Sequence, residues 1–273
     1  SFSVGTKLDN TPHTGVGSQR RVAIVSQSGG LGFAIHNRGI KRGIAFSHVI
    51  GTGNESHLGV LDFTEHLLEK KEVGAIVLLI EQLRGATGFL DVAEKAAKLG
   101  KPLIVVKFGR SEAARRGALS HTGSLTGGAH AYDAVFRHAG VIHADDQDDL
   151  LDIAAAFTSC PLPKGRNVGI VTISGGAGVW LADTCERHGL SVPELDADLQ
   201  ADLRSFIPDY GGVTNPVDIT AQALEQGGNV AAIERLYDSP QIDSLIVAAS
   251  MAEATMIAAE EAELTRIQAR QEK

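Results

Sequence analysis

One histidine on a glycine-rich loop points most directly to chemistry. His121 lies within the run 117–128, GALSHTGSLTGG, whose small residues let a bulky anion approach the imidazole ring. A suitably oriented histidine can act as a nucleophile. The helix expected over 129–139 follows at once, and a helix start favours phosphate through free N–H groups and a positive dipole end. The loop therefore predicts a histidine that carries a phosphoryl group, and an exposed histidine without chemistry is the alternative.

Glu81 is the expected partner of this histidine. It follows residues 74–80, an uninterrupted apolar run that predicts a buried strand of a parallel sheet. A carboxylate that accepts a hydrogen bond from one ring nitrogen fixes the tautomer and leaves the other nitrogen free to attack phosphorus. The alternative is an exposed glutamate that merely ends the strand.

The tripeptide Ser-Gly-Gly occurs twice, each time between an expected strand and an expected helix. The two copies are Ser28, Gly29 and Gly30, and Ser174, Gly175 and Gly176. Glycine lets a ligand approach the backbone, serine adds a hydroxyl donor, and the helix start adds N–H donors. Two copies at the same point of the chain therefore predict two anion sites, with plain N-cap serines as the alternative. Neither copy is a P-loop or a dinucleotide fingerprint.

The elements that position these residues alternate between strand and helix, which predicts an α/β fold with parallel sheets covered on both faces. The run 21–32, RVAIVSQSGGLG, matches 167–178, NVGIVTISGGAG, and indicates a duplicated domain. We expect strands at 22–25, 46–50, 74–80, 103–106, 141–142, 190–192 and 244–249. We expect helices near 31–41, 57–70, 88–99, 129–139, 146–158, 177–188, 196–205, 229–237 and 252–271.

The boundaries follow from composition. Residues 1–20 predict a linker or arm, 21–160 a first domain with the histidine loop, and 166–273 a second domain. The stretch PLPKG at 161–165 separates the two domains. The second copy shows no counterpart of the histidine loop, so we expect it to be incomplete and the chain to be part of something longer.

Composition excludes several classes of protein. The 273 residues carry a net charge of −8 and no basic stripe, which argues against nucleic acid as a partner. No apolar run approaches the roughly 18 residues that cross a membrane. Cys160 and Cys185 are far apart and, like the remaining histidines, show no metal-ligand spacing, so no metal site is expected. These features predict a cytoplasmic protein with reduced thiols.

Four motifs together resemble the NDP-forming acyl-CoA synthetases, which belong to the superfamily of succinyl-CoA synthetase. They are VSQSGGLG at 25–32, SHTGSLTG at 120–127, SGGAGV at 174–179 and NPVDIT at 215–220. The resemblance covers nearly all of residues 20–250. It implies two tandem flavodoxin-like, three-layer domains and a reaction that joins a carboxylic acid to CoA using ATP or GTP, through an acyl phosphate and a phosphohistidine.

The resemblance also implies roles for individual residues. His121 matches the phosphorylated histidine and Glu81 the glutamate that orients it. Ser28, Gly29 and Gly30 match the helix start that holds the phosphoryl group on the CoA side. Ser174, Gly175 and Gly176 match the helix start used when the histidine reaches the nucleotide side.

The resemblance implies further parts that this chain does not show. A CoA-binding domain and an ATP-grasp domain, which bind CoA and the nucleotide with Mg²⁺, belong to a longer chain or a partner subunit. The family tends to form homo- or hetero-oligomers, and the fragment alone should lack full activity. Acetate, branched-chain, aryl and hydroxycinnamic acids such as ferulate all stay open as the acid.

Two other classes of protein remain as alternatives. A non-catalytic ligand-sensing or scaffold module could keep the fold while His121 is never phosphorylated. A dehydrogenase-like nucleotide binder is disfavoured because the dinucleotide fingerprint is missing.

Overall fold

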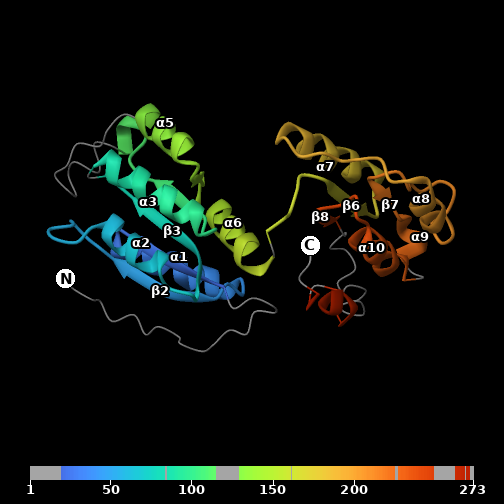
Figure 1. Cartoon of the computed structure of the whole chain (residues 1–273), viewed down its shortest axis with the longest axis horizontal. Coiled ribbons are helices and arrows are strands. Elements are labelled where there is room, and N and C mark those ends of the chain that lie inside the picture. Colours follow the sequence, from blue (N-terminus) through green and yellow to red (C-terminus); the bar gives the residue numbers. More distant parts are fainter. Residues whose placement is uncertain are drawn as a thin grey trace. The chain divides into compact units, whose positions relative to one another are not determined.

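The structure is a computed structural model that describes residues 20–83, 85–114, 129–160, 162–224, 227–248, 262–267 and 269–270. The chain divides into two compact units, residues 1–160 and 161–273, which Figure 1 shows with their helices and strands. Each unit has its own parallel sheet with helices on both faces, so the predicted α/β fold is confirmed.

The sheet of the first unit has the strand order β2-β1-β3-β4-β5, and all neighbouring strands are parallel. Its strands are β1 (Arg21–Ser26), β2 (Phe46–Gly51), β3 (Val73–Ile80), β4 (Leu103–Lys107) and β5 (Ile142–His143). The order is that of a flavodoxin-like doubly wound sheet, whose ligands bind outside the carboxyl ends of the strands. The loops after β1 and β3 therefore meet at the edge where chemistry is expected.

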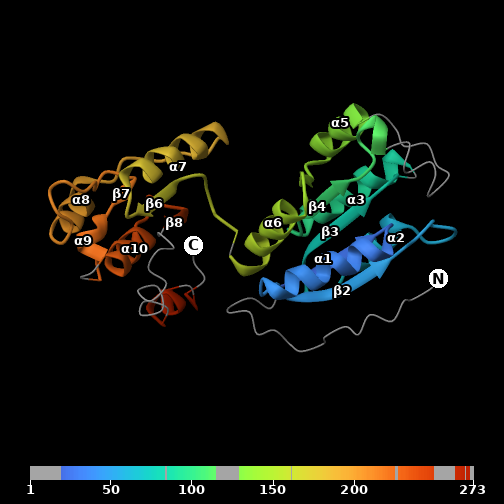
Figure 2. The ribbon, with the colours of Figure 1, turned by 180° about the vertical axis from the view of Figure 1, so that it is seen from behind.

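Alternate residues of each strand face two separate cores, because side chains along a strand point to opposite faces. On β3 every residue is buried: Ile76, Leu78 and Ile80 enter one core, and Ala75, Val77 and Leu79 enter the other. The first core lies under α2 (Val60–Leu68), α3 (Ala86–Lys98) and α5 (Ala129–Ala139), seen in Figure 1. The second lies under α1 (Gly29–Lys41) and α6 (Gln147–Ser159), seen in Figure 2.

The second unit repeats the beginning of this plan. Its described sheet has the order β7-β6-β8, again parallel, with β6 (Val168–Thr172) between β7 (Val217–Asp218) and β8 (Ser244–Ala248). The helices are α7 (Gly175–Arg187) on one face and α8 (Ala197–Arg204), α9 (Thr220–Leu224) and α10 (Gly228–Asp238) on the other. The order matches β2-β1-β3 of the first unit, as the sequence repeat predicts.

Two predicted elements are wrong in part. The strand expected at 190–192 is only a single parallel bridge between Ser191 and Asn167. Pro193 follows directly and has no N–H to extend the ladder. The helix expected over 57–70 begins at Val60, because Gly59 is extended and its N–H donates to the Asp62 carboxylate at 2.8 Å. His57 therefore precedes the helix.

Two further expectations concern the last part of the chain. The short helix α9 was not predicted; it begins at Thr220, the last residue of the NPVDIT motif, directly after the two-residue strand β7 and Ile219. Of the helix expected over 252–271, residues 262–267 and 269 are helical, and the other residues of that range, apart from Arg270, lie outside the described residues.

Candidate functional site

The first candidate site lies where β1 turns into α1. Ser28 is the N-cap residue of α1, yet its side chain makes no capping hydrogen bond. Ser26 holds the turn instead, because its hydroxyl accepts from the Ser28 N–H at 3.1 Å and donates to the Ser28 carbonyl at 2.6 Å. The first N–H groups of α1 are thus not covered by the cap side chain, which leaves them to an anion.

Gly29 and Gly30 form the first turn of α1 and border open space. A Cβ atom on either residue would meet no heavy atom within 4 Å, and neither residue has a positive φ. Neither packing nor backbone conformation among the described residues therefore calls for glycine here. Alanine would even favour the helix by up to about 1 kcal/mol per residue. A ligand that binds close to the backbone needs free space of this kind beside the glycines.

The second unit repeats the turn with one difference at the cap. The Thr172 hydroxyl accepts from the Ser174 N–H at 3.1 Å and donates to the Ser174 carbonyl at 3.2 Å, as Ser26 does in the first unit. Here, however, the Ser174 hydroxyl accepts from the Ala177 N–H, at a long 3.5 Å. The plain N-cap alternative thus applies to Ser174 and not to Ser28.

Among the described residues, a carboxylate borders the second helix start and none borders the first. A Cβ on Gly175 would lie 3.0 Å from Oδ2 of Asp218, whereas Gly176 borders open space. Asp218 pairs with Thr172 at the end of β7, and in the first unit the corresponding pair is Ser26 with Gly51. The positive end of α7 is therefore already faced by a negative charge, and that of α1 is faced by glycine.

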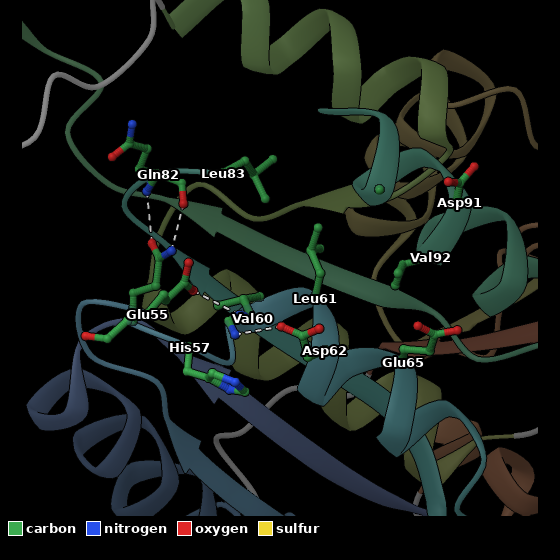
Figure 3. Close-up of a pocket in the computed structure, with 14 residues that line it drawn as sticks. Glu55, His57, Val60, Leu61, Asp62, Glu65, Gln82, Leu83, Asp91 and Val92 are labelled. Carbon is green, nitrogen blue, oxygen red and sulfur yellow. Dashed lines mark hydrogen bonds between the residues drawn. The ribbon is translucent and has the colours of Figure 1, made fainter. Parts of the chain in front are cut away.

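Glu81 leaves β3 at the same edge as the α1 start and is half-buried. Its N–H donates to Oε1 of Gln27 at 2.6 Å, and the Gln82 N–H donates to the same oxygen at 2.9 Å. Nε2 of Gln27 donates in return to the Gln82 carbonyl at 2.7 Å, and dashed lines in Figure 3 mark the two bonds to Gln82. The residue before Ser28 thus holds the turn that carries Glu81.

Lys107 brings a buried positive charge to the same region. It ends β4, pairs with Ile80, and is only 4% exposed. Burial, and to a lesser degree the Arg110 charge, lower the pKa of its ammonium to about 8, while the Glu81 carboxylate opposes the shift. Its Nζ donates to the Phe108 carbonyl and lies 4.7 Å from the centre of the Tyr132 ring.

Sequence reasoning missed both Gln27 and Lys107. Gln27 stands inside the VSQSGG motif, but its targets lie 54 and 55 positions away along the chain. Lys107 did carry a signal, since a lysine that closes the apolar run LIVV interrupts a strand expected to be buried.

The comparisons with known proteins match both units of the chain. The model of the succinyl-CoA ligase-like flavodoxin domain matches residues 19–157, and that of the ligase-CoA domain matches residues 168–269.

The chain belongs to the succinyl-CoA ligase-like flavodoxin domain family.

Curated relatives of this ligase-domain chain include ADP-forming CoA ligases. It is 42% identical over 231 residues to the acetate–CoA ligase [ADP-forming] II subunit alpha of Pyrococcus furiosus, covering 85% of this chain and 50% of that one. It is 32% identical to the 4-hydroxybutyrate–CoA ligase [ADP-forming] of Nitrosopumilus maritimus, covering 88% and 34%. It is 34% identical to a trans-feruloyl-CoA synthase from an unknown prokaryotic organism, covering 76% and 29%. The chain thus spans half or less of the length of these relatives.

A solved structure of the same kind is similar in fold. It is the dinucleotide-forming acetyl-coenzyme A synthetase 1 of Ca. Korarchaeum cryptofilum, in complex with phosphate and ADP. The TM-score is 0.79 at 28% identity, and the match covers 93% of this chain and 55% of that one.

The histidine loop of this ligase-domain chain lies outside the described residues, and so does His121 within it. The described chain stops at residue 114 and resumes with α5 at residue 129, on the side of the sheet that also carries α2 and α3. The structure therefore brings together Glu81 and the start of α1 from the predicted set. Ser174, Gly175 and Gly176 belong to the other unit.

A cavity of about 610 Å³ opens beside the turn after β3, between the starts of α2 and α3. Figure 3 shows its wall, which carries His57 and the carboxylates Glu55, Asp62, Glu65 and Asp91. Oε1 of Glu55 accepts from the Val60 N–H at 2.9 Å. Because an acidic wall repels anions, this cavity is not where we place a phosphoryl group.

The described residues also bear on membrane insertion and on metal binding. No helix there is both long enough and apolar enough to cross a bilayer. Nor do three or more His, Cys, Asp or Glu side chains of that part gather as metal ligands.

Proposed function

We propose that this chain is the phosphohistidine-bearing part of an NDP-forming acyl-CoA synthetase. The observation that carries the proposal is the pairing of an uncapped, glycine-lined helix start at α1 with Glu81, held by Gln27 at the same sheet edge. The family match and the ADP-forming CoA ligases among the relatives support it.

His121 is the catalytic nucleophile in this proposal. Glu81 accepts a hydrogen bond from one ring nitrogen, which fixes the tautomer, and the other nitrogen attacks phosphorus. In the direction of synthesis the γ-phosphoryl group of the nucleotide moves to that nitrogen and the nucleoside diphosphate leaves. A substrate carboxylate oxygen then takes the phosphoryl group, and the acyl phosphate formed is attacked by the CoA thiol, which releases phosphate and acyl-CoA.

The two helix starts hold the phosphoryl group of the phosphohistidine at different stages. Ser28, Gly29 and Gly30 act on the CoA side, and Ser174, Gly175 and Gly176 act on the nucleotide side. Fixed N–H donors and a helix dipole stabilise the charge of a transferring phosphoryl group without reorganising during the reaction. Positioning and electrostatics account for most catalysis of this kind.

The remaining substrates are bound by other parts of the complete enzyme. CoA and ATP or GTP, the latter with Mg²⁺, occupy a CoA-binding domain and an ATP-grasp domain in a longer chain or a partner subunit. The acid is a small carboxylic acid, with acetate, 4-hydroxybutyrate and ferulate represented among the relatives. We place the enzyme in the cytoplasm as a homo- or hetero-oligomer.

Intact mass analysis of the complete enzyme after incubation with ATP and Mg²⁺ tests the proposal. We expect an acid-labile adduct of one phosphoryl group that His121→Ala abolishes. His138→Ala is the matched control, because His138 is exposed on the last turn of α5 and belongs to no proposed site. A wild-type enzyme that binds nucleotide and forms no adduct would contradict the proposal and favour the ligand-sensing module.

A further inference from the structure

We infer that Gln27 is a positioning residue that couples the phosphoryl-binding helix start to Glu81. The inference rests on the proposed function and adds a residue to it. Gln27 is the link between the two, since its backbone leads directly into Ser28 and its side chain holds the turn at residues 81–82.

Both the oxygen and the nitrogen of the Gln27 side-chain amide form hydrogen bonds to the backbone of the turn at residues 81–82. A primary amide has one acceptor oxygen with two lone pairs and two donor hydrogens. The oxygen accepts both N–H groups, at 2.6 Å from Glu81 and 2.9 Å from Gln82, and the nitrogen donates to the Gln82 carbonyl at 2.7 Å. No other neutral side chain of this length offers both functions, so the turn depends on glutamine.

The backbone reinforces this link. The Gln27 N–H donates to the Leu79 carbonyl at 3.1 Å, which continues the pairing of β1 with β3 beyond the last strand residue. On the other side the Leu83 N–H donates to the hydroxyl of Tyr132 on α5 at 3.1 Å. Three successive N–H groups after β3 therefore donate to side chains, and the direction in which Glu81 leaves the strand is fixed.

The second unit lacks the chemistry for such a link. At the place of Gln27 in the repeated motif stands Ile173, which packs against the apolar core and has no hydrogen-bonding group in its side chain. The Ser26 and Thr172 bonds around this position are otherwise alike. The glutamine thus distinguishes the copy that carries Glu81, which is what a positioning role for that carboxylate requires.

Gln27→Met in the complete enzyme tests the link, because methionine fills similar space without an acceptor or donor. We expect the single-turnover rate constant for phosphorylation of His121 by ATP to fall about 100-fold, as a misplacement near 1 Å does. The ATP concentration that gives half the maximal rate should stay unchanged, since the nucleotide binds elsewhere in our proposal. Hydrogen exchange of amides 81 and 82 should quicken.

Two further variants separate positioning from loss of fold. Gln200→Met is the matched control, because its amide donates to the Leu195 carbonyl at 2.6 Å in the second unit; we expect an ordinary phosphorylation rate and unchanged exchange at 81 and 82. Gln27→Glu keeps the acceptor oxygen, so both amides should stay slow to exchange and the rate should exceed that of Gln27→Met.

Several outcomes would overturn the inference. Unchanged exchange at amides 81 and 82 in Gln27→Met would show that the link does not exist in solution. Faster exchange with an unchanged phosphorylation rate would show that it does not position Glu81, as would equal rates for Gln27→Glu and Gln27→Met with protection kept in the former. A wild type that forms no phosphohistidine would instead remove the proposed function, and with it the catalytic part of this inference, whereas hydrogen exchange would still report the link.

Discussion

At the scale of single residues, two neighbouring strand ends carry opposite charges. Glu81 follows Ile80, which pairs with Lys107, and the ammonium of Lys107 interacts with the Glu81 carboxylate. The arrangement gives each residue a separate testable consequence.

Glu81→Gln should slow phosphorylation of His121 without unfolding the chain. The amide keeps the size of the side chain and the backbone bonds to Gln27, but it loses the negative charge that fixes the imidazole tautomer. We expect a fall of about 100-fold or more in the single-turnover rate, by analogy with the size of general acid–base effects. An unchanged rate, followed by the phosphohistidine adduct in intact mass spectra, would contradict the role of Glu81.

Lys107→Met should stabilise the first unit at neutral pH and not at high pH. The folded pKa of about 8 lies below the ordinary 10.5, so between these values the unfolded chain binds the proton more strongly, and wild-type stability rises with pH from about 8 to 10.5. Below pH 8 the variant should gain up to about 3 kcal/mol, less the lost bond to the Phe108 carbonyl. Calorimetry at pH 7 and pH 10.5 measures the difference, and an equal gain at both pH values would contradict it.

The sequence predicted Glu81 at its strand end because an apolar run of 74–80 leaves little choice of register. It could not predict that Gln27 holds it, since residues 27 and 81 meet only after β1 and β3 have paired. It could not separate Ser28 from Ser174 either. Both have the residues of an N-cap, and the geometry of each turn decides whether the hydroxyl reaches an N–H.

At the scale of elements, strand runs were predicted better than helix boundaries. Both glycine-rich helices begin at the first glycine after the serine, at Gly29 and Gly175, two residues before the apolar pattern suggested. Helix propensity counts against glycine there, and the turn formed by Ser26 or Thr172 overrides it. The segment 190–192 forms only a single bridge, because Pro193 follows it and has no N–H to extend the ladder.

Gly178→Ala should destabilise the second unit, whereas Gly176→Ala, two residues earlier on the same helix, should not. A Cβ at Gly178 would lie 2.9 Å from Cβ of Pro216 and 3.1 Å from Cγ2 of the buried Thr172, and a Cβ at Gly176 would meet nothing. Overpacking costs about 1–3 kcal/mol, partly offset by better helix propensity. Calorimetry should show a lower midpoint for Gly178→Ala and an equal or higher one for Gly176→Ala; equal midpoints would contradict the close approach of α7 to Pro216.

At the scale of the whole molecule, the repeat in the sequence predicted two units of one plan, and the shared strand order agrees. The repeat did not predict that Asp218 and Gly51 occupy equivalent strand ends, because the segments around them are not similar in sequence. The two residues are equivalent because Asp218 pairs with the last residue of β6 and Gly51 pairs with the last residue of β1. The two helix starts therefore differ in charge although their motifs agree.

Of the described residues, Lys164 should be the first after which limited trypsin digestion cuts, and two folded fragments should remain. The stretch 162–166 is exposed and joins two units that have separate cores. Arg166 is a poorer target, because its side chain donates to the Gly189 carbonyl at 3.1 Å. In addition, the carbonyl of its neighbour Asn167 accepts a hydrogen bond from the Ser244 N–H at the start of β8. Mass spectrometry identifies the site, and circular dichroism of the separated fragments checks their fold. Early cuts inside β1 to β4 would contradict two independent cores.

Variants at Gly29 and Gly30, at the start of α1, should rank differently in a mutant library selected for heat tolerance and in one selected for turnover. Because no described residue would meet a methyl group at Gly29 or Gly30, variants ranked by heat tolerance should place alanine above the native residue at both positions. Variants ranked by turnover would reverse that order if an anion sits against the bare backbone. Positions at which the two rankings disagree would then outline a binding surface with no ligand ever having been seen on it.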